Sequence, residues 1–292
     1  MGRSGNIVPL RGQHGVAPVL DLGGPQLRAA LEDLVEASAS TGGIDVYVNA
    51  LGVKSALFAA LLGRDAIVRL DENLLRDLLA LMPTVRRRAR MWLDKEGAAS
   101  LRARIITLME GHGREQPVDE LIAQFTGQFP AGNDYRWTRD LAAEILHFTA
   151  PDRCPLMTRW IWDGNAKTGV LREIWFDDAI DEKRVVIRDD FATFKVLADE
   201  IAGFLRENGF FRELSLCQDV MFAHVYARYI NDRGNQFLKG DFGGPEDRMA
   251  HTRRMLGLDA PGSKKNRIAT PAIVDQSVPE PLQINRTRHA DS

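Results

Sequence analysis

Apolar residues recur at helical spacing along most of the chain. The stripe over 27–35 follows Gly23-Gly24-Pro25, and proline is well tolerated in a first helical turn. Asp71 is a candidate N-cap for a leucine-rich helix that Pro83 ends or kinks. Residues 213–230 are apolar on nearly every face, which predicts a buried central helix.

Most of the remaining chain also reads as helix, so the sequence predicts a mainly α fold, a multi-helix globular body. Glu173-Ile174-Trp175-Phe176 and Arg184-Val185-Val186-Ile187 interrupt the helical pattern as β-prone runs around an acidic turn, which predicts a small β-hairpin near residues 171–188. Short connections predict antiparallel neighbours. Further helices are expected over 54–62, 84–95, 98–110, 117–126, 136–149 and 191–205, with a last one after Gly243-Gly244-Pro245.

The two ends differ in composition from the middle. Residues 1–18 and 259–292 are polar, contain proline and arginine and lack periodicity, so we expect a disordered N-terminal segment and a disordered C-terminal tail. Residues 19–258 form the expected helical globular body. Length leaves open whether this body is single or has two lobes that meet near 165–190.

Overall composition is that of an ordinary globular protein. Hydrophobic residues make up 45% of the chain and the formal net charge is -2, so any nucleic-acid surface must be local. Two distant cysteines, Cys154 and Cys217, favour a reducing compartment. Because we find neither a signal-peptide core nor an apolar stretch of membrane-spanning length, we expect a soluble protein of the bacterial cytoplasm with no membrane partner.

One predicted helix carries residues able to bind a metal. Asp140, Glu144 and His147 lie one turn apart on a single face, and Glu144-x-x-His147 resembles the spacing of ferritin-like di-metal bundles. No second such pair occurs, although Asp247 and His251 would complete a mononuclear site. The alternative is a solvated face with an ion-paired histidine.

Residues 43–52, Gly-Ile-Asp-Val-Tyr-Val-Asn-Ala-Leu-Gly, resemble the strand beside the nicotinamide in short-chain dehydrogenases. The glycine-rich fingerprint and the Tyr-x-x-x-Lys pair of that family are missing, and no Walker-type phosphate loop occurs. The chain therefore has no nucleotide-binding motif, and its cofactor, if any, is unknown.

A second resemblance concerns Leu146-His147-Phe148 and the Pro-x-x-x-Pro that follows at Pro151 and Pro155. This stretch is similar to one in relatives of the helix-hairpin-helix DNA glycosylases. The resemblance implies a carboxylate just after the second proline. The matching place is near Thr158, and Asp163 is the nearest aspartate downstream. An enzyme is therefore one alternative, either a glycosylase-like protein that processes nucleic acid or a metal-dependent helical enzyme that uses the Glu144/His147 face. Its candidate catalytic residues are His147, Asp163 and His224.

The other alternative is a helical protein without catalysis. Arg86, Arg87, Arg88 and Arg90 fall close together on one predicted helix, and guanidinium groups suit the recognition of acidic partners. Trp160 and Trp162 supply aromatic groups that bind a partner if they are exposed. Because no catalytic motif is complete, the leading hypothesis is an accessory protein that binds another macromolecule, a protein or, alternatively, nucleic acid. The sequence does not determine the oligomeric state.

Polar residues on the expected central helix need partners. An unpaired buried polar group costs about 1–3 kcal/mol, so these side chains form either a structural network or the lining of a pocket. They are Gln218, Asp219, His224, Tyr226 and Arg228.

Overall fold

The computed structural model describes residues 20, 22–175, 187–235 and 247–259, with no account of side chains over 231–235. Its described part is built almost entirely from helices, which confirms the mainly α fold. The elements are α1 (Gly24–Ala39), α2 (Ile44–Leu62), α3 (Arg64–Ile67), α4 (Glu72–Ala80), α5 (Arg86–Glu96), α6 (Ala98–Gly113), α7 (Val118–Thr126), the 3₁₀ helix η1 (Asn133–Tyr135), α8 (Trp137–Thr149), α9 (Val170–Glu173), α10 (Phe191–Glu207), α11 (Leu214–Asn235) and α12 (Ala250–Leu256).

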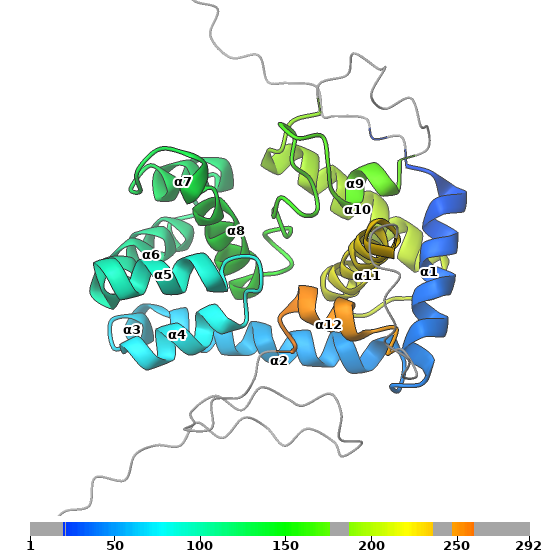
Figure 1. Cartoon of the computed structure of the whole chain (residues 1–292), viewed down its shortest axis with the longest axis horizontal. Helices are drawn as coiled ribbons and strands as arrows, with labels where there is room; N and C mark the ends of the chain where they lie inside the picture. Colours follow the sequence, from blue (N-terminus) through cyan, green and yellow to red (C-terminus); the bar gives the residue numbers. More distant parts are fainter. Residues whose placement is uncertain (1–19, 21, 176–186, 236–246, 260–292) are drawn as a thin grey trace, which may run out of the picture.

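The helices gather in two groups that share α2. Figure 1 shows α3 to α8 on one side, α1 and α9 to α12 on the other, and α2 along the base of both. α2 packs against α8 in the first group and against α1 and α11 in the second. Buried apolar residues from both groups belong to one hydrophobic cluster. The division into lobes near 165–190 stays a prediction, because 176–186 lie outside the described residues.

Helix starts follow the expected side-chain chemistry. Asp71 caps α4 by accepting a hydrogen bond from the Leu74 backbone N–H at 2.8 Å. Asp190 caps α10 through Thr193, accepting from its N–H at 3.1 Å and from its hydroxyl at 2.9 Å. The predicted central helix 213–230 corresponds to α11, in which Val220 and Ala223 are fully buried.

α2 begins ten residues before the expected start of its helix, Lys54. Residues 44–52, which resemble a dehydrogenase strand, are its first turns. β-branched residues favour strands only weakly, and tertiary packing overrides that preference when a helix can bury them. Val48 and Leu51 are buried in this helix, so the segment that resembles the dehydrogenase strand is helical here.

The expected hairpin near 171–188 is not present in its described part. Residues 170–173 form the short helix α9, and Trp175 makes an isolated antiparallel bridge with Leu22, near the start of α1. Residues 176–186, which hold the rest of the proposed hairpin, lie outside the described residues. The same holds for 1–19 and 260–292, which include most of the two expected disordered ends.

α12 closes the junction between α2 and α11. It ends at Gly257, whose φ of 71° lies in the left-handed region that glycine adopts without strain. A Cβ atom at this position would lie 1.9 Å from the carbonyl oxygen of Leu81, so any larger residue would push α12 away from the α4–α5 connection.

α2 is also long and apolar enough to cross a membrane by length and composition, with a mean hydropathy of 1.4. This corrects the expectation that no stretch has membrane-spanning character. A core helix passes the same test, and α2 packs against α1, α8 and α11. Its buried Lys54 takes part in an ionic cluster described below.

Candidate functional site

The polar face of α8 is buried, so the expectation of a solvated face is wrong. Asp140, Glu144 and His147 are 3%, 4% and 1% exposed. Charged groups in such positions need partners, because removing a charge from water is costly. Each of the three side chains has its own partners, and these come from different parts of the chain.

Asp140 holds the segment that follows α8. Its carboxylate accepts from the guanidinium of Arg159 at 2.6 and 3.0 Å and from the Arg159 backbone N–H at 3.0 Å. Its neighbour Arg139 donates to the carbonyl oxygens of Met157 and Asp189 at 2.8 and 2.6 Å. The candidate metal ligand Asp140 therefore fixes the loop between α8 and α9.

His147 lies between a carboxylate and a carbonyl. Its Nε2 is 2.7 Å from Asp219 Oδ2 on α11, and its Nδ1 is 2.8 Å from the carbonyl oxygen of Cys154. A carbonyl oxygen can only accept a hydrogen bond, so Nδ1 must carry a proton. When Nε2 is protonated as well, the imidazolium ring donates to both partners. Burial by itself lowers the pKa of His147, but the charge and hydrogen bond of Asp219, with the Cys154 carbonyl, outweigh it and raise the pKa. We infer a buried imidazolium–carboxylate pair.

Glu144 faces Lys54 of α2. Their closest charged atoms are 3.9 Å apart, and Glu144 also accepts a hydrogen bond from the hydroxyl of Thr84 at 2.9 Å. Burial raises the pKa of Glu144 to about 7 and lowers the pKa of Lys54 to about 8, and their mutual attraction opposes both shifts. Sequence spacing did not point to Lys54 as a partner of Glu144, because it lies within an apolar helix.

Lys54 also joins α12 to this cluster. Its ammonium donates to the carbonyl oxygen of Leu256 at 2.9 Å, at the end of α12, where the helix dipole is negative. It lies 3.7 Å from the centre of the Phe148 ring, a cation–π distance. The four groups Lys54, Glu144, His147 and Asp219 thus tie α2, α8, α11 and α12 together.

The metal ligands suggested by the sequence do not assemble. Asp247 pairs with Arg253, and His251 is exposed. Within the described ranges, no group of three His, Cys, Asp or Glu side chains is placed to hold a metal ion. Asp140, Glu144 and His147 are engaged by Arg159, Lys54 and Asp219, respectively.

His224 occupies a separate network at the α1–α11–α12 contact. Its Nε2 is 2.7 Å from Asp33 Oδ2, and its Nδ1 is 3.1 Å from the hydroxyl of Thr252. A hydroxyl can donate to Nδ1, so a neutral imidazole satisfies both contacts. Burial is the largest influence on the pKa of His224 and lowers it. Arg248 and Arg228 complete the charge balance around Asp33.

Asp163, the candidate aspartate of the glycosylase resemblance, supports a turn. It accepts from the backbone N–H groups of Asn165 and Ala166 at 3.1 and 3.0 Å and pairs with Arg136 at 2.6 Å. Backbone hydrogen bonds and Arg136 overcome the effect of burial and lower its pKa. Thr158 is fully buried.

Trp160 and Trp162 do not lie on an exposed surface. They are 7% and 3% exposed, so the expectation of exposed aromatic groups is wrong for both. Trp160 packs against Tyr226 with ring centres 5.6 Å apart, and Trp162 donates to the Ile187 carbonyl at 3.4 Å. Large aromatic rings bury enough apolar area to favour the core when a turn brings them back to it.

The arginines of α5 are the sequence candidates that do face solvent. Arg87, Arg88 and Arg90 are exposed and Arg86 is half-buried. Arg86 and Arg88 lie 3.5 and 3.4 Å from the carboxylates of Asp259 and Asp134. Within the part of the chain that the structure describes, no acidic side chain pairs with Arg87 or Arg90. We call Arg87, Arg88 and Arg90 the arginine face.

The opposite side of α5 anchors this face to the core. Trp92 packs against Phe129, Tyr135 and Trp137, with ring centres 5.0, 5.9 and 6.5 Å apart. The guanidinium of Arg104 lies 5.4 Å from the Trp92 ring. A helix held by an aromatic cluster presents its outer side chains from a rigid base.

The candidate catalytic residues do not converge on one cleft. His147 pairs with Asp219, His224 with Asp33, and Asp163 with Arg136. Cys154 and Cys217 are both buried and free, and burial chiefly raises the pKa of the Cys217 thiol to about 11, which disfavours the reactive thiolate. Sequence spacing alone could not reveal these pairings, since the partners are 27 to 191 residues apart.

No protein-family model, curated protein or solved structure matches this chain, so its own geometry must carry the functional argument.

Proposed function

We propose that this protein is a non-catalytic or accessory helical protein of the bacterial cytoplasm that binds an acidic segment of another protein through the arginine face. The observation that carries the proposal is the placement of the arginines on α5. Arg86, Arg87 and Arg88 occupy its first turn, which contains no acidic residue. The first turn is the positive end of the helix dipole, where cations are unfavourable by about 0.3–1 kcal/mol.

Two further features of α5 support the binding of a partner by its arginines. Arg87 and Arg90 have no acidic partner among the described residues, so their charges are available to a ligand. Met91 is 55% exposed beside them and offers an apolar contact. A partner segment that carries carboxylates and nearby apolar side chains would match the arginines and Met91. Flexible methionines are common at surfaces that bind protein segments.

A protein partner fits the whole chain better than nucleic acid does. The formal net charge is -2, whereas nucleic-acid binders draw most of their affinity from a basic excess that neutralises phosphates. The buried free thiols of Cys154 and Cys217 support a reducing compartment such as the cytoplasm.

Binding of a defined acidic peptide tests the proposal. Fluorescence anisotropy with labelled poly-L-glutamate should give saturable binding that the variant Arg87→Gln/Arg88→Gln/Arg90→Gln weakens at least about tenfold. The matched control Arg28→Gln/Arg114→Gln/Arg212→Gln removes the same charge from exposed arginines elsewhere and should leave the affinity unchanged. Equal losses in both variants would mean that only net charge matters, and would overturn the proposal.

A duplex DNA oligonucleotide serves as the competing ligand. We expect weaker binding to DNA than to poly-L-glutamate at the same salt concentration. Tighter binding to DNA, lost in the arginine-face variant and steeply dependent on salt, would replace the protein partner by nucleic acid.

A further inference from the structure

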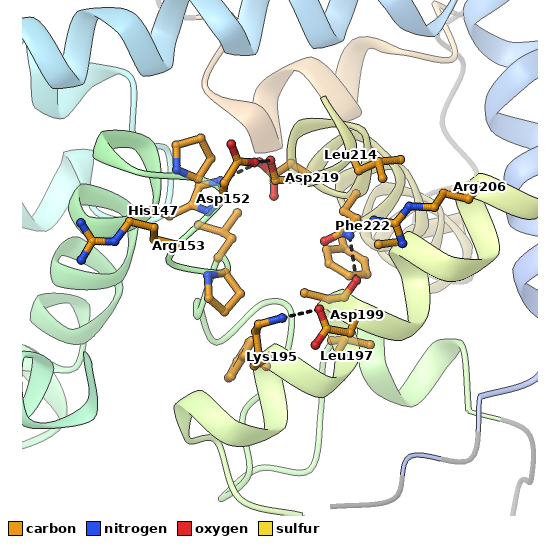
Figure 2. Close-up of a pocket in the computed structure, with 18 residues that line it drawn as sticks. His147, Asp152, Arg153, Lys195, Leu197, Asp199, Arg206, Leu214, Asp219 and Phe222 are labelled. Carbon is orange, nitrogen blue, oxygen red and sulfur yellow. Dashed lines mark hydrogen bonds and ion pairs between the residues drawn. The ribbon is translucent and has the colours of Figure 1, made fainter. Parts of the chain in front are cut away.

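A pocket opens beside the His147–Asp219 pair. It takes no part in the binding proposed for the arginine face. It lies between α10, α11 and the loop after α8, as Figure 2 shows, and its volume is about 170 Å³. Pockets for drug-sized ligands measure roughly 300–1,000 Å³, so this one suits a molecule of few heavy atoms.

One face of α11 forms a wall of the pocket. Ser215, Gln218, Asp219 and Phe222 all line it, and their spacing of three, four and seven residues places them on the same side of the helix. Asp152, from the loop after α8, accepts from the Ser215 hydroxyl at 2.8 Å. Asp152 and Asp219 therefore present their carboxylates within about one turn of α11.

Two buried side chains in this wall have acceptor oxygens to spare. Asp219 is 2% exposed, and its Oδ2 is taken by His147, while no described residue donates to its Oδ1. Gln218 is 7% exposed, and its amide nitrogen donates to the Ala198 carbonyl at 2.8 Å, while no described residue donates to its Oε1. Both residues line the pocket, so these two oxygens can accept hydrogen bonds from a ligand that carries N–H groups.

The charges around the pocket are only partly matched. Lys195 and Asp199 pair with each other on α10. Arg153 points away from the pocket in Figure 2 and pairs with Glu115 at 3.7 Å. Two charged residues, both exposed to solvent, then lack a described partner of opposite charge: Asp152 and Arg206.

These two unmatched charges lie on different sides of the pocket. Figure 2 shows Arg206 reaching from α10 toward the pocket on the side of Phe222, with Asp152 and Asp219 on the other side. Between them the lining includes Phe222 and Leu197, which offer apolar contact.

We propose that this pocket binds a small zwitterion, an apolar amino acid. Its ammonium group donates to Asp219 Oδ1, Gln218 Oε1 and Asp152, and its carboxylate pairs with Arg206. Its side chain packs against Phe222 and Leu197. His147 is a positioning residue, because it holds Asp219 from behind through the other carboxylate oxygen.

Calorimetric titration of the full chain with each apolar amino acid tests the proposal. At least one, with L-leucine as the first probe, should bind with a Kd below about 1 mM. Two analogues divide its charges: 3-methylbutylamine lacks the carboxylate, and 4-methylpentanoate lacks the ammonium. Each should bind at least about tenfold more weakly than L-leucine, because each leaves one pocket charge unmatched.

Variants assign the two ends of the ligand. Arg206→Gln and Asp152→Asn should each weaken amino-acid binding about tenfold or more while leaving the circular dichroism spectrum unchanged. Arg153→Gln is the matched control, since Arg153 borders the same pocket but points away, and it should leave the affinity unchanged.

Three outcomes would overturn the proposal. They are no heat of binding for any apolar amino acid up to about 10 mM, equal affinity for 4-methylpentanoate, or full affinity in Arg206→Gln. Because none of the pocket variants touches the arginine face, failure here is distinguishable from failure of the macromolecule-binding proposal.

Discussion

At the residue scale, the two buried histidines show how one hydrogen-bond partner sets a protonation state. His147 and His224 each place one ring nitrogen 2.7 Å from an aspartate oxygen. They differ in the second partner, a carbonyl for His147 and a hydroxyl for His224. The carbonyl beside His147 can only accept, so both ring nitrogens of His147 need a proton and the cation is favoured. The hydroxyl beside His224 can donate to an unprotonated ring nitrogen, so the neutral ring is favoured there.

We therefore expect the two histidines to titrate on opposite sides of the ordinary value of about 6.5. The imidazole ¹⁵N shifts of His147 should stay those of the cation above that pH, and His224 should stay neutral below it. The variant His224→Gln assigns the signals by removing one set. Two histidines with the same midpoint would contradict this account of their partners.

Glu144 predicts a second pH effect. Its folded pKa of about 7 lies above the ordinary value of 4.5, so the folded state holds this proton more tightly than the unfolded state does. Its contribution to stability is complete below the unfolded value and is lost as the pH rises through about 7.

Glu144→Gln should remove that contribution, because a neutral amide of the same shape replaces the carboxyl group. Between the two pKa values, the free energy of unfolding of the wild type should fall relative to the variant by on the order of 1–3 kcal/mol. Urea unfolding at a series of pH values measures the difference. A difference that is constant with pH would show that folding does not raise the pKa of Glu144.

At the element scale, α5 and α12 each have positive charge near one helix end, with opposite effects on stability. α5 begins with three arginines at its positive end, and α12 ends where Lys54 donates to the Leu256 carbonyl. The first arrangement opposes the helix dipole and the second follows it. The unfavourable one is exposed and the favourable one is buried, which fits a binding role for the first and a structural role for the second.

Arg87→Glu should therefore stabilise the fold while weakening binding to poly-L-glutamate. We expect the free energy of unfolding to rise by about 0.3–1 kcal/mol, since a carboxylate suits the first turn of a helix. Arg114→Glu is the control, because Arg114 caps the negative end of α6 and reversal of its charge should destabilise the protein. Thermal unfolding of both variants gives the signs, and a loss of stability in Arg87→Glu would contradict the dipole argument.

Gly257→Ala should disrupt the packing of the C-terminal end of α12 against Leu81. The new methyl group would enter the space of the Leu81 carbonyl, and alanine is strained at a φ of 71°, so we expect a loss of about 2–4 kcal/mol. Gly203→Ala is the opposite control: Gly203 lies in the interior of α10 with nothing within 4 Å of the added Cβ, and alanine favours helix by about 0.5–1 kcal/mol. Chemical denaturation compares the two. Equal stability of Gly257→Ala and the wild type would show that the α12 contact yields at little cost.

At the scale of the whole molecule, α2 and the shared core join the two groups of helices. All five tryptophans are buried, with Trp92 and Trp137 on α5 and α8 and the other three between α8 and α10. The ionic cluster around Lys54 adds contacts across the same junction. These connections predict that the groups unfold together.

Tryptophan fluorescence and far-ultraviolet circular dichroism should accordingly report one transition with a common midpoint in denaturant. Trp92→Phe and Trp160→Phe, each removing one reporter, should keep that midpoint shared between the two probes. Two separate transitions would show that the groups are independent lobes.

The sequence by itself determined the secondary structure of most of the described chain. Helical spacing, the cap at Asp71, and the glycine and proline breaks are local properties, so they predict helices without knowledge of the fold. The prediction failed where local preference and packing disagree, at the first turns of α2 and at α9.

Only the tertiary structure decided what the polar residues do. Asp140, Glu144 and His147 share a helical face by spacing, but their partners Arg159, Lys54 and Asp219 come from elsewhere in the chain. Spacing along one helix fixes which side chains lie together on it, whereas charge pairing depends on which other elements return to that helix. For this reason the sequence located the polar face of α8 but could not show that it is buried and paired with side chains of other elements.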